Sequence, residues 1–200
     1  MSSHPSERFA ANLRRLRDEA DLSQEELAFR AAIHRTQVSL LEGGRRMPRV
    51  ETLVKLAGSL GATPNDLLDG STGSRSRPSP AAWSSRLRKA ARMPERERAL
   101  AVAERFGQNL RRVRKREDLS QEQLARRASL HRTEIGKLEN TERVCRIDTL
   151  IRLAGAMAVE PAELLDGIHW VPGPEPEGAF AFGASSITRI PSPATDESGG

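Results

Sequence analysis

The sequence predicts an all-α protein in which a linker joins two tandem five-helix bundles and a mostly irregular C-terminal tail follows. The main observation is an internal repeat. Residues 22–42 recur 97 positions later as residues 119–139, and residues 106–167 align with residues 9–70 without a gap, with about half the positions identical. Apolar residues in both copies follow a helical period. Aromatic residues are only 4% of the chain and Tyr is absent, so small aliphatic cores are expected. An ungapped repeat of this length indicates duplication.

Four segments follow from the repeat. We expect a first module at residues 1–70, a basic linker with a helical C-terminal part at 71–104, a second module at 105–167 and an irregular tail at 168–200. A module of about 60 residues is small but can fold alone when well packed. We expect Trp170 of the tail to pack back on the second module.

The first two helices of each module have clear local signals. Phe9, Leu13 and Leu16 have the i, i+4, i+7 spacing of a buried helix face, with residues 1–6 expected to fray. Ser23 and Glu26 form the pattern of a capping box at the start of the second helix. The second copy repeats this box with Ser and Gln, so both modules are expected to start this helix in the same way.

Three more helices complete the module. The third is predicted at residues 35–42 and stops at Gly43, since glycine readily takes the conformation of a helix end. The fourth carries Val50, Leu53 and Leu56 inward, and Pro64 marks the first turn of the fifth. Each module is therefore expected to hold five short helices around one small core.

Positive charge is concentrated in the middle of the chain. Residues 75–117 hold 14 basic and four acidic side chains, whereas residues 1–74 hold ten of each. Residues 71–80 have the composition of a linker, residues 81–92 suggest a short helix containing Trp83, and residues 95–116 form a strongly helical run that merges into the second module. The basic block suits a polyanion because neutralised phosphates release counterions. A solvated basic surface explains it equally well.

The third helix has the side chains of a base-reading helix. Arg35 and Gln37 lie on its outer face, and Arg and Gln make paired hydrogen bonds to guanine and adenine edges, respectively. A helix of this size fits the major groove of DNA. A solvated polar face is the alternative, and spacing alone does not separate the two.

The whole pattern resembles a known family. Leu-Ser-Gln-Glu-x-Leu-Ala-x-x-Ala, an Arg-Thr turn, a helix ending Leu-Glu, a Gly/basic loop and Thr-Leu-x-x-Leu-Ala are similar to the XRE-type helix-turn-helix family of phage Cro and cI repressors. The resemblance covers residues 8–70 and 105–167. It implies lambda-repressor-like bundles whose third helix enters the major groove of double-stranded DNA.

The resemblance also assigns residues. It implies that Arg17 and Arg114 pair structurally with Glu42 and Glu139. The expected DNA-binding residues are the glutamine opening the second helix, the outer face of the third helix and the loop after it: Gln24, Arg35, Thr36, Gln37, Ser39, Leu40, Arg45, Arg46, Arg49, Gln121, Arg132, Thr133, Glu134, Lys137 and Arg143.

The second copy departs from the pattern on its exposed side. Glu134 replaces Gln37 and repels phosphate, Gly136 weakens its helix, and Thr141 stands where the family has glycine. The alternative function is therefore a protein-interaction module for dimerisation, an antitoxin-like role or polymerase contact, with the second bundle off the DNA. A homodimer or a protein partner held through the second module or the tail stays open.

Other kinds of function have no sequence support. The histidines lack metal-ligand spacing, and no nucleophile, phosphate-loop or dinucleotide motif occurs, so neither an enzyme, a metal nor a cofactor is expected. His34 and His131 stand at the start of the third helix of each module, where helix capping or a phosphate contact explains them better than catalysis. Cys145, the single cysteine, allows no internal disulfide, and no membrane segment is found. We expect a cytoplasmic, repressor-like transcriptional regulator whose two modules replace the usual two subunits, tethered by a flexible linker.

Overall fold

The computed structural model describes residues 5–69, 95–172 and 178–182, and it contains the two helical modules that the repeat predicts. The predicted helix at 81–92, with Trp83, lies outside these residues. The first module contains α1 (Pro5–Glu19), α2 (Gln24–Arg30), α3 (Arg35–Glu42), α4 (Val50–Leu60) and α5 (Pro64–Leu68). The second contains α7 (Glu95–Arg116), α8 (Gln121–Arg127), α9 (Arg132–Glu139), α10 (Ile147–Met157) and α11 (Pro161–Leu164).

Local signals place most of these helices. Ser23 Oγ accepts a hydrogen bond from the Glu26 amide at 3.1 Å, and Glu26 accepts one from the Ser23 amide at 2.7 Å, so the capping box is confirmed. Ser120 and Gln123 repeat it. The helical run at 95–116 is also confirmed as α7. The expected fraying of residues 1–6 was wrong for Pro5 and Ser6, which lie in α1, since a proline suits the first turn of a helix.

Each module has a core of the expected aliphatic type with one large aromatic residue. Phe9 in α1 and Phe106 in α7 occupy equivalent positions, and both are almost completely buried. The buried apolar residues form one cluster that runs through both modules. The modules are therefore packed against each other and do not depend on a tether alone to stay together.

Equivalent parts of the two copies meet at the module interface. Arg49 and Arg146, which are 97 positions apart, form an antiparallel β-bridge. The Val50 amide donates to the Cys145 carbonyl at 3.1 Å, and the Ile147 amide donates to the Pro48 carbonyl at 3.4 Å. Helix α4 contacts α10 and α5 contacts α11. Reciprocal contacts between equivalent residues are the mark of a two-fold interface, so the two modules are paired about a local pseudo-two-fold axis.

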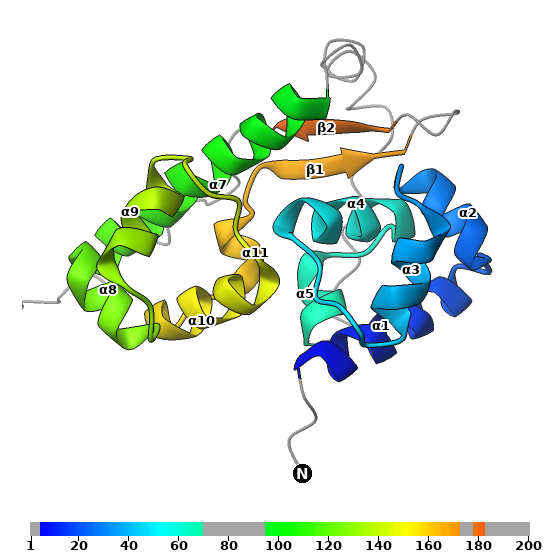
Figure 1. Cartoon of the computed structure of the whole chain (residues 1–200), viewed down its shortest axis with the longest axis horizontal. Coiled ribbons are helices and arrows are strands. Elements are labelled where there is room, and N and C mark those ends of the chain that lie inside the picture. Colours follow the sequence, from blue (N-terminus) through cyan, green and yellow to red (C-terminus); the bar gives the residue numbers. More distant parts are fainter. Residues whose placement is uncertain (1–4, 70–94, 173–177, 183–200) are drawn as a thin grey trace, which may run out of the picture.

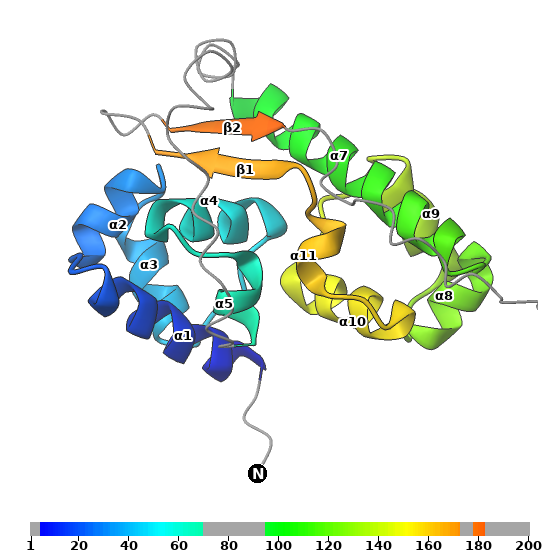
Figure 2. The same ribbon diagram turned by 180° about the vertical axis from the view of Figure 1, so that it is seen from behind.

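The described part of the tail is more ordered than expected and lies on the other module. Strands β1 (Ile168–Val171) and β2 (Ala179–Phe182) form an antiparallel pair, with Trp170 opposite Phe180. Figures 1 and 2 both show this pair lying along α4 of the first module. The expectation that Trp170 packs on the second module was wrong: its indole lies on α4, where a glycine allows the strand to approach closely.

Candidate nucleic-acid interface

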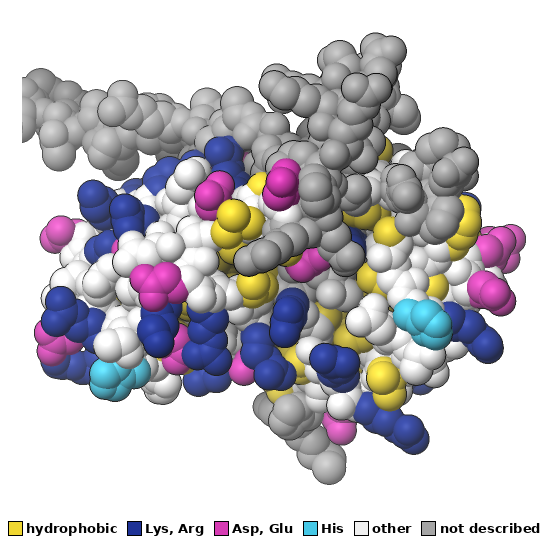
Figure 3. Space-filling view, turned by 45° about the horizontal axis from the view of Figure 1, so that its top comes forward, with side chains coloured by type: hydrophobic (Ala, Val, Ile, Leu, Met, Phe, Trp, Pro, Cys, Tyr) yellow, Lys and Arg dark blue, Asp and Glu magenta, His cyan; other side chains and the backbone are white. Residues whose placement is uncertain are grey.

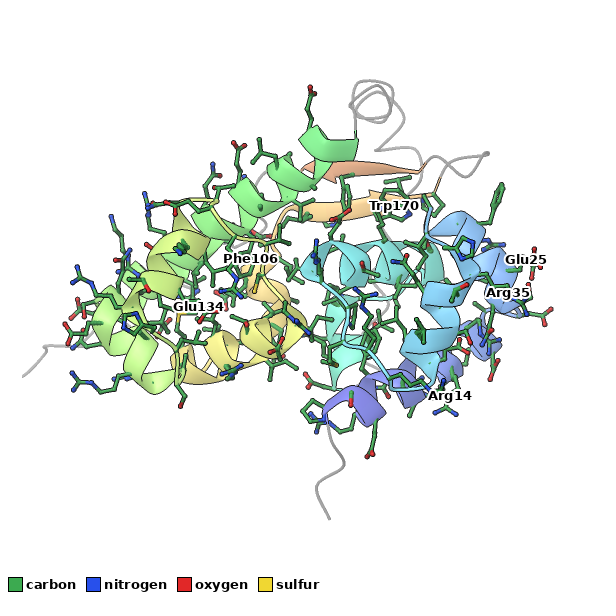
Figure 4. The ribbon with its side chains drawn as sticks, in the orientation of Figure 1. Arg14, Glu25, Arg35, Phe106, Glu134 and Trp170 are labelled. Atoms are coloured by element: carbon green, nitrogen blue, oxygen red, sulfur yellow. The ribbon has the colours of Figure 1, made fainter. Side chains whose placement is uncertain are left out.

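The outer face of α3 is presented to solvent as the sequence predicted. His34 is the N-cap residue, and its Nδ1 accepts the Thr36 amide hydrogen bond at 3.2 Å, so its capping role is confirmed. Val38 and Leu41 point into the core, which turns Arg35, Gln37 and their neighbours outward. Thr36 and Ser39 are also exposed, and Leu40 is half-buried. Figure 4 shows Arg35 at the outer edge of the first module.

A buried ion pair fixes the back of this helix. Arg17 Nε donates to Glu42 Oε1 at 2.7 Å, and Arg17 Nη1 donates to the Leu22 carbonyl at 2.8 Å. Gln24 Nε2 donates to Glu42 Oε2 at 2.7 Å. The predicted structural pair is confirmed, and Glu42 links α1, the start of α2 and the end of α3. Gln24 is half-buried and held in place by this carboxylate, and its phosphate contact stays a prediction.

The second module repeats the same network more deeply buried. Arg114 donates to Glu139 at 2.6 and 3.0 Å, and Gln121 Nε2 donates to Glu139 Oε2 at 2.9 Å. Arg111 adds a contact with Glu139 at 3.5 Å. Burial raises the pKa of Glu139, but hydrogen bonds from Arg114 and Gln121 and the charges of Arg114 and Arg111 outweigh it, so the pKa is lowered. The carboxylate is therefore held ionised inside the protein.

The outer face of α9 differs from that of α3. Arg132, Thr133 and Lys137 are exposed, but Glu134 is half-buried and pairs with Arg143 at 3.4 Å. Figure 4 labels Glu134 in the second module. Both residues were predicted to contact DNA, and in the structure the charge of Arg143 is partly neutralised by Glu134. The exposed faces of α3 and α9 are therefore held by the same buried network and present different side chains.

The loop after α9 keeps the backbone of its counterpart without the glycine. Thr141 has φ +68°, close to the +67° of Gly44 at the equivalent position. A left-handed conformation costs roughly 1–2 kcal/mol for a residue with a side chain. The fold of the module therefore holds Thr141 in a left-handed backbone conformation that its side chain disfavours.

Loops from the two modules border one groove. Arg45, Arg46 and Arg49 of the first module are exposed. A groove of about 720 Å³ lies between this loop and the loop after α9. Its charged and amide-bearing lining residues are Gln37, Arg46, Arg49, Glu51, Lys55, Glu142, Arg143 and Arg146. Figure 3 shows Lys and Arg side chains spread over one face of both modules, with Asp and Glu between them.

Arg146 is a lining arginine that lies outside the DNA-binding residues expected from the sequence. Its signal was present, because it is the repeat counterpart of Arg49. Arg146 is exposed and lies 3.5 Å from Asp148. The groove therefore brings together predicted site residues from both modules at the pseudo-two-fold interface.

Comparisons with known proteins match both modules. A profile described as "Helix-turn-helix" matches residues 13–67, and one described as "Helix-turn-helix domain" matches residues 105–166. The chain belongs to the XRE-type helix-turn-helix family, in two tandem copies. Control protein C.BamHI of Bacillus amyloliquefaciens is 38% identical over 65 residues, which is 32% of this chain and 80% of the relative.

Further relatives of this XRE-type chain carry similar names. Control protein C.SmaI of Serratia marcescens is 44% identical over 64 residues, 32% of this chain and 76% of the relative. The solved restriction-modification controller protein C.AhdI from Aeromonas hydrophila is 39% identical, covering 32% of this chain and 97% of that chain with a TM-score of 0.32. These names describe regulators and not enzymes.

Two properties of the described residues bear on other kinds of site. No group of three or more His, Cys, Asp or Glu side chains there is placed to hold a metal ion. None of the helices in this part of the chain has both the length and the apolar character needed to cross a membrane. Burial strongly raises the pKa of the Cys145 thiol, which keeps it protonated and a poor nucleophile.

Proposed function

We propose that this XRE-type chain is a sequence-specific, repressor-like transcriptional regulator that reads the major groove of double-stranded DNA with one recognition helix per module. The observation that carries the proposal is the exposed face of α3, where the side chains of Arg35 and Gln37 make no hydrogen bond or ion pair with the described residues. These are the side chains best suited to guanine and adenine edges. Two relatives named as control proteins support a regulatory role.

The two modules replace two subunits in this proposal. Their interface pairs equivalent residues, Arg49 with Arg146, so the recognition helices are related by a pseudo-two-fold axis. A protein with two recognition helices related by a two-fold axis matches two oppositely oriented half-sites about one helical turn, roughly 34 Å, apart. Because Gln37 is replaced by Glu134 and Leu40 by Lys137, we expect the two half-sites to differ in sequence.

The test is selection of bound sequences from random DNA by the full chain at fixed salt. Arg35→Ala/Gln37→Ala should erase the preference at one half-site, and Arg132→Ala/Lys137→Ala at the other. Arg14→Ala is the charge control, because Arg14 lies on α1 and its Nε donates to the Ala10 carbonyl of the same helix. If neither double variant changes the selected sequence, the recognition-helix assignment is wrong.

A protein-interaction role for the second module is the alternative, and one contact favours it. Glu134 pairs with Arg143, and Glu142 directly precedes Arg143 on the same loop, so this surface carries acidic groups where DNA phosphates would approach. Salt separates the two functions. DNA affinity falls steeply with ionic strength, whereas an apolar protein interface does not. Glu134→Gln should strengthen DNA binding if α9 lies on DNA, and should leave it unchanged if the module binds a protein.

Repression is tested directly. Transcription in vitro from a promoter that overlaps the selected site should fall as the chain is added, because a protein spanning both half-sites excludes the polymerase. An increase in transcript would assign an activator instead.

A further inference from the structure

The feature that carries a further inference is the C-terminal strap, which we define as residues 166–171 with residues 178–182. It begins where α11 of the second module ends and lies on α4 of the first module. Figures 1 and 2 both show it following α4 between the two modules. The strap therefore connects the modules by a route separate from the bridge between Arg49 and Arg146.

The first end of the strap is fixed to the second module. The Asp166 carbonyl accepts hydrogen bonds from Asn109 Nδ2 at 2.8 Å and from Arg105 Nε at 3.3 Å. The Asp166 carboxylate accepts one from Arg112 Nη2 at 3.3 Å. All three donors lie on α7, so the strap leaves the second module in a defined direction.

The other end is fixed to the first module by Trp170. Its indole Nε1 donates to the Arg30 carbonyl at 2.9 Å, and only 4% of the residue is exposed. Its ring meets that of Phe180 edge-on at 5.1 Å, and Lys55 Nζ lies 5.2 Å from the Trp170 ring centre. A cation over an indole in a desolvated position adds to this anchoring. Figure 4 shows Trp170 beside α4.

A glycine on α4 makes this contact possible. A Cβ on Gly58 would lie 2.2 Å from the Trp170 carbonyl oxygen and 2.8 Å from its Cβ, so the strand rests directly on the helix backbone. The repeat counterpart of Gly58 is Gly155 on α10, where a Cβ would meet nothing within 4 Å. The described strap therefore covers this surface in one module and leaves its counterpart open.

The position of the Trp170 anchor relates it to DNA reading. Arg30 is the last residue of α2, and four residues later His34 caps α3. Two other contacts between the modules in the described residues join equivalent elements. One is the Arg49–Arg146 bridge, and the other is at Asn65, whose Oδ1 accepts from the Ala162 amide at 3.1 Å and whose Nδ2 donates to Glu160 at 3.0 Å. Contacts close to a two-fold axis keep the two modules together but oppose rotation of one module against the other only weakly. A contact that ends at the helix-turn-helix, away from this interface, opposes that rotation more strongly.

We propose that the C-terminal strap fixes the angle between the modules and so makes the chain select one spacing between half-sites. Trp170 and Gly58 would be positioning residues in this arrangement, since they contact no base. This inference rests on the proposed DNA-reading function for its biological meaning. Each base pair added between half-sites rotates one against the other by roughly 34°, so a fixed module angle penalises wrong spacings.

The first measurement needs no DNA. Spin labels are attached to the full chain at Ser39→Cys and Gly136→Cys, equivalent positions on α3 and α9; buried Cys145, whose thiol has a raised pKa, should stay unlabelled. A narrow distance distribution is expected. Gly58→Ala should broaden it by displacing the strap, and the matched Gly155→Ala should not. A narrow distribution in both Gly58→Ala and Trp170→Ala would overturn the inference, whatever the chain does with DNA.

The second measurement uses the site selected by the wild-type chain, rebuilt with its half-sites moved apart or together in single base pairs. The wild type and Gly155→Ala should bind the best spacing about tenfold tighter than spacings two base pairs away. Gly58→Ala and Trp170→Ala should reduce this ratio to about threefold or less while binding to a single half-site is kept. An unchanged ratio in both variants refutes the strap's role. If the wild type selects no sequence, the proposed function fails, while the distance measurement still decides whether the strap fixes the module angle.

Discussion

The ion pair between Arg114 and Glu139 gives a prediction whose size follows from burial. The Glu139 side chain is 0% exposed and that of Arg114 is 10% exposed, and Arg114 Nη1 also donates to the Leu119 carbonyl at 2.7 Å. Removing one partner of a buried pair typically costs about 3–5 kcal/mol because the other charge is left uncompensated. Gln121 and Arg111 still contact Glu139, so Arg114→Ala should fall at the low end, about 3 kcal/mol.

The measurement is urea unfolding of the full chain followed by helical circular dichroism. Arg126→Ala is the matched control in the same module: its pair with Glu122 is 3.5 Å long with side chains 80% and 67% exposed, so its loss should cost less than about 0.5 kcal/mol. A loss of under about 1 kcal/mol for Arg114→Ala, or an equal loss for the control, would refute the reasoning from burial.

The same pair should also shape the acid limit of stability. The net effect of its partners lowers the pKa of Glu139 below the usual 4.5. A carboxylate with a lowered folded pKa contributes stability above its unfolded value and loses it as pH falls through the folded value. In Arg114→Ala the largest lowering interaction is gone, so the folded pKa of Glu139 moves back toward the unfolded value, and stability should fall less than in the wild type as pH drops below 4.5.

Three further predictions test separate features. Arg46→Ala should lower the slope of log affinity against log salt by about 0.9 if Arg46 contacts one phosphate, and an unchanged slope would place it off the DNA. Thr141→Gly should raise the free energy of unfolding by about 1 kcal/mol because φ there is +68°; no gain would mean that the loop is unstrained. Burial lowers the pKa of His169 below 6.5, although Asp166 opposes this shift. The free energy of unfolding should therefore decline as pH falls from about 6.5 toward the folded pKa of His169. His169→Gln should flatten this decline. If the decline is unchanged in the variant, another titrating group causes it.

The helices and their ends were largely predictable because their signals are local. The capping box of Ser23 and Glu26 fixes the start of α2 within four residues of sequence, and His34 does the same for α3. The Arg17–Glu42 pair was predicted from family resemblance and was confirmed. The outward direction of Arg35 followed from helical period once Val38 and Leu41 were assigned to the core. Its contact with DNA stays a prediction.

The relation between the modules was not predictable from such signals. Trp170 and Arg30 are 140 positions apart in the sequence, and their hydrogen bond depends on how two whole modules are placed. Helical period marks Gly58 and Gly155 alike, but the strap contacts only the first. Pairing Glu134 with Arg143 likewise depends on where a loop returns beside a helix. Contacts of this kind are decided by three-dimensional shape complementarity, which no short window of sequence contains.

By itself, then, the sequence determined that one helical module occurs twice, where its helices start, and which side chains its third helix turns outward. Periodicity and capping act over a few residues, and the repeat is visible by aligning the sequence with itself. Only the tertiary structure decided that the modules pair through equivalent residues, Arg49 with Arg146, and that the C-terminal strap crosses to the first module. Those outcomes depend on burying apolar surface between distant segments, and that burial is settled only when the whole chain has folded.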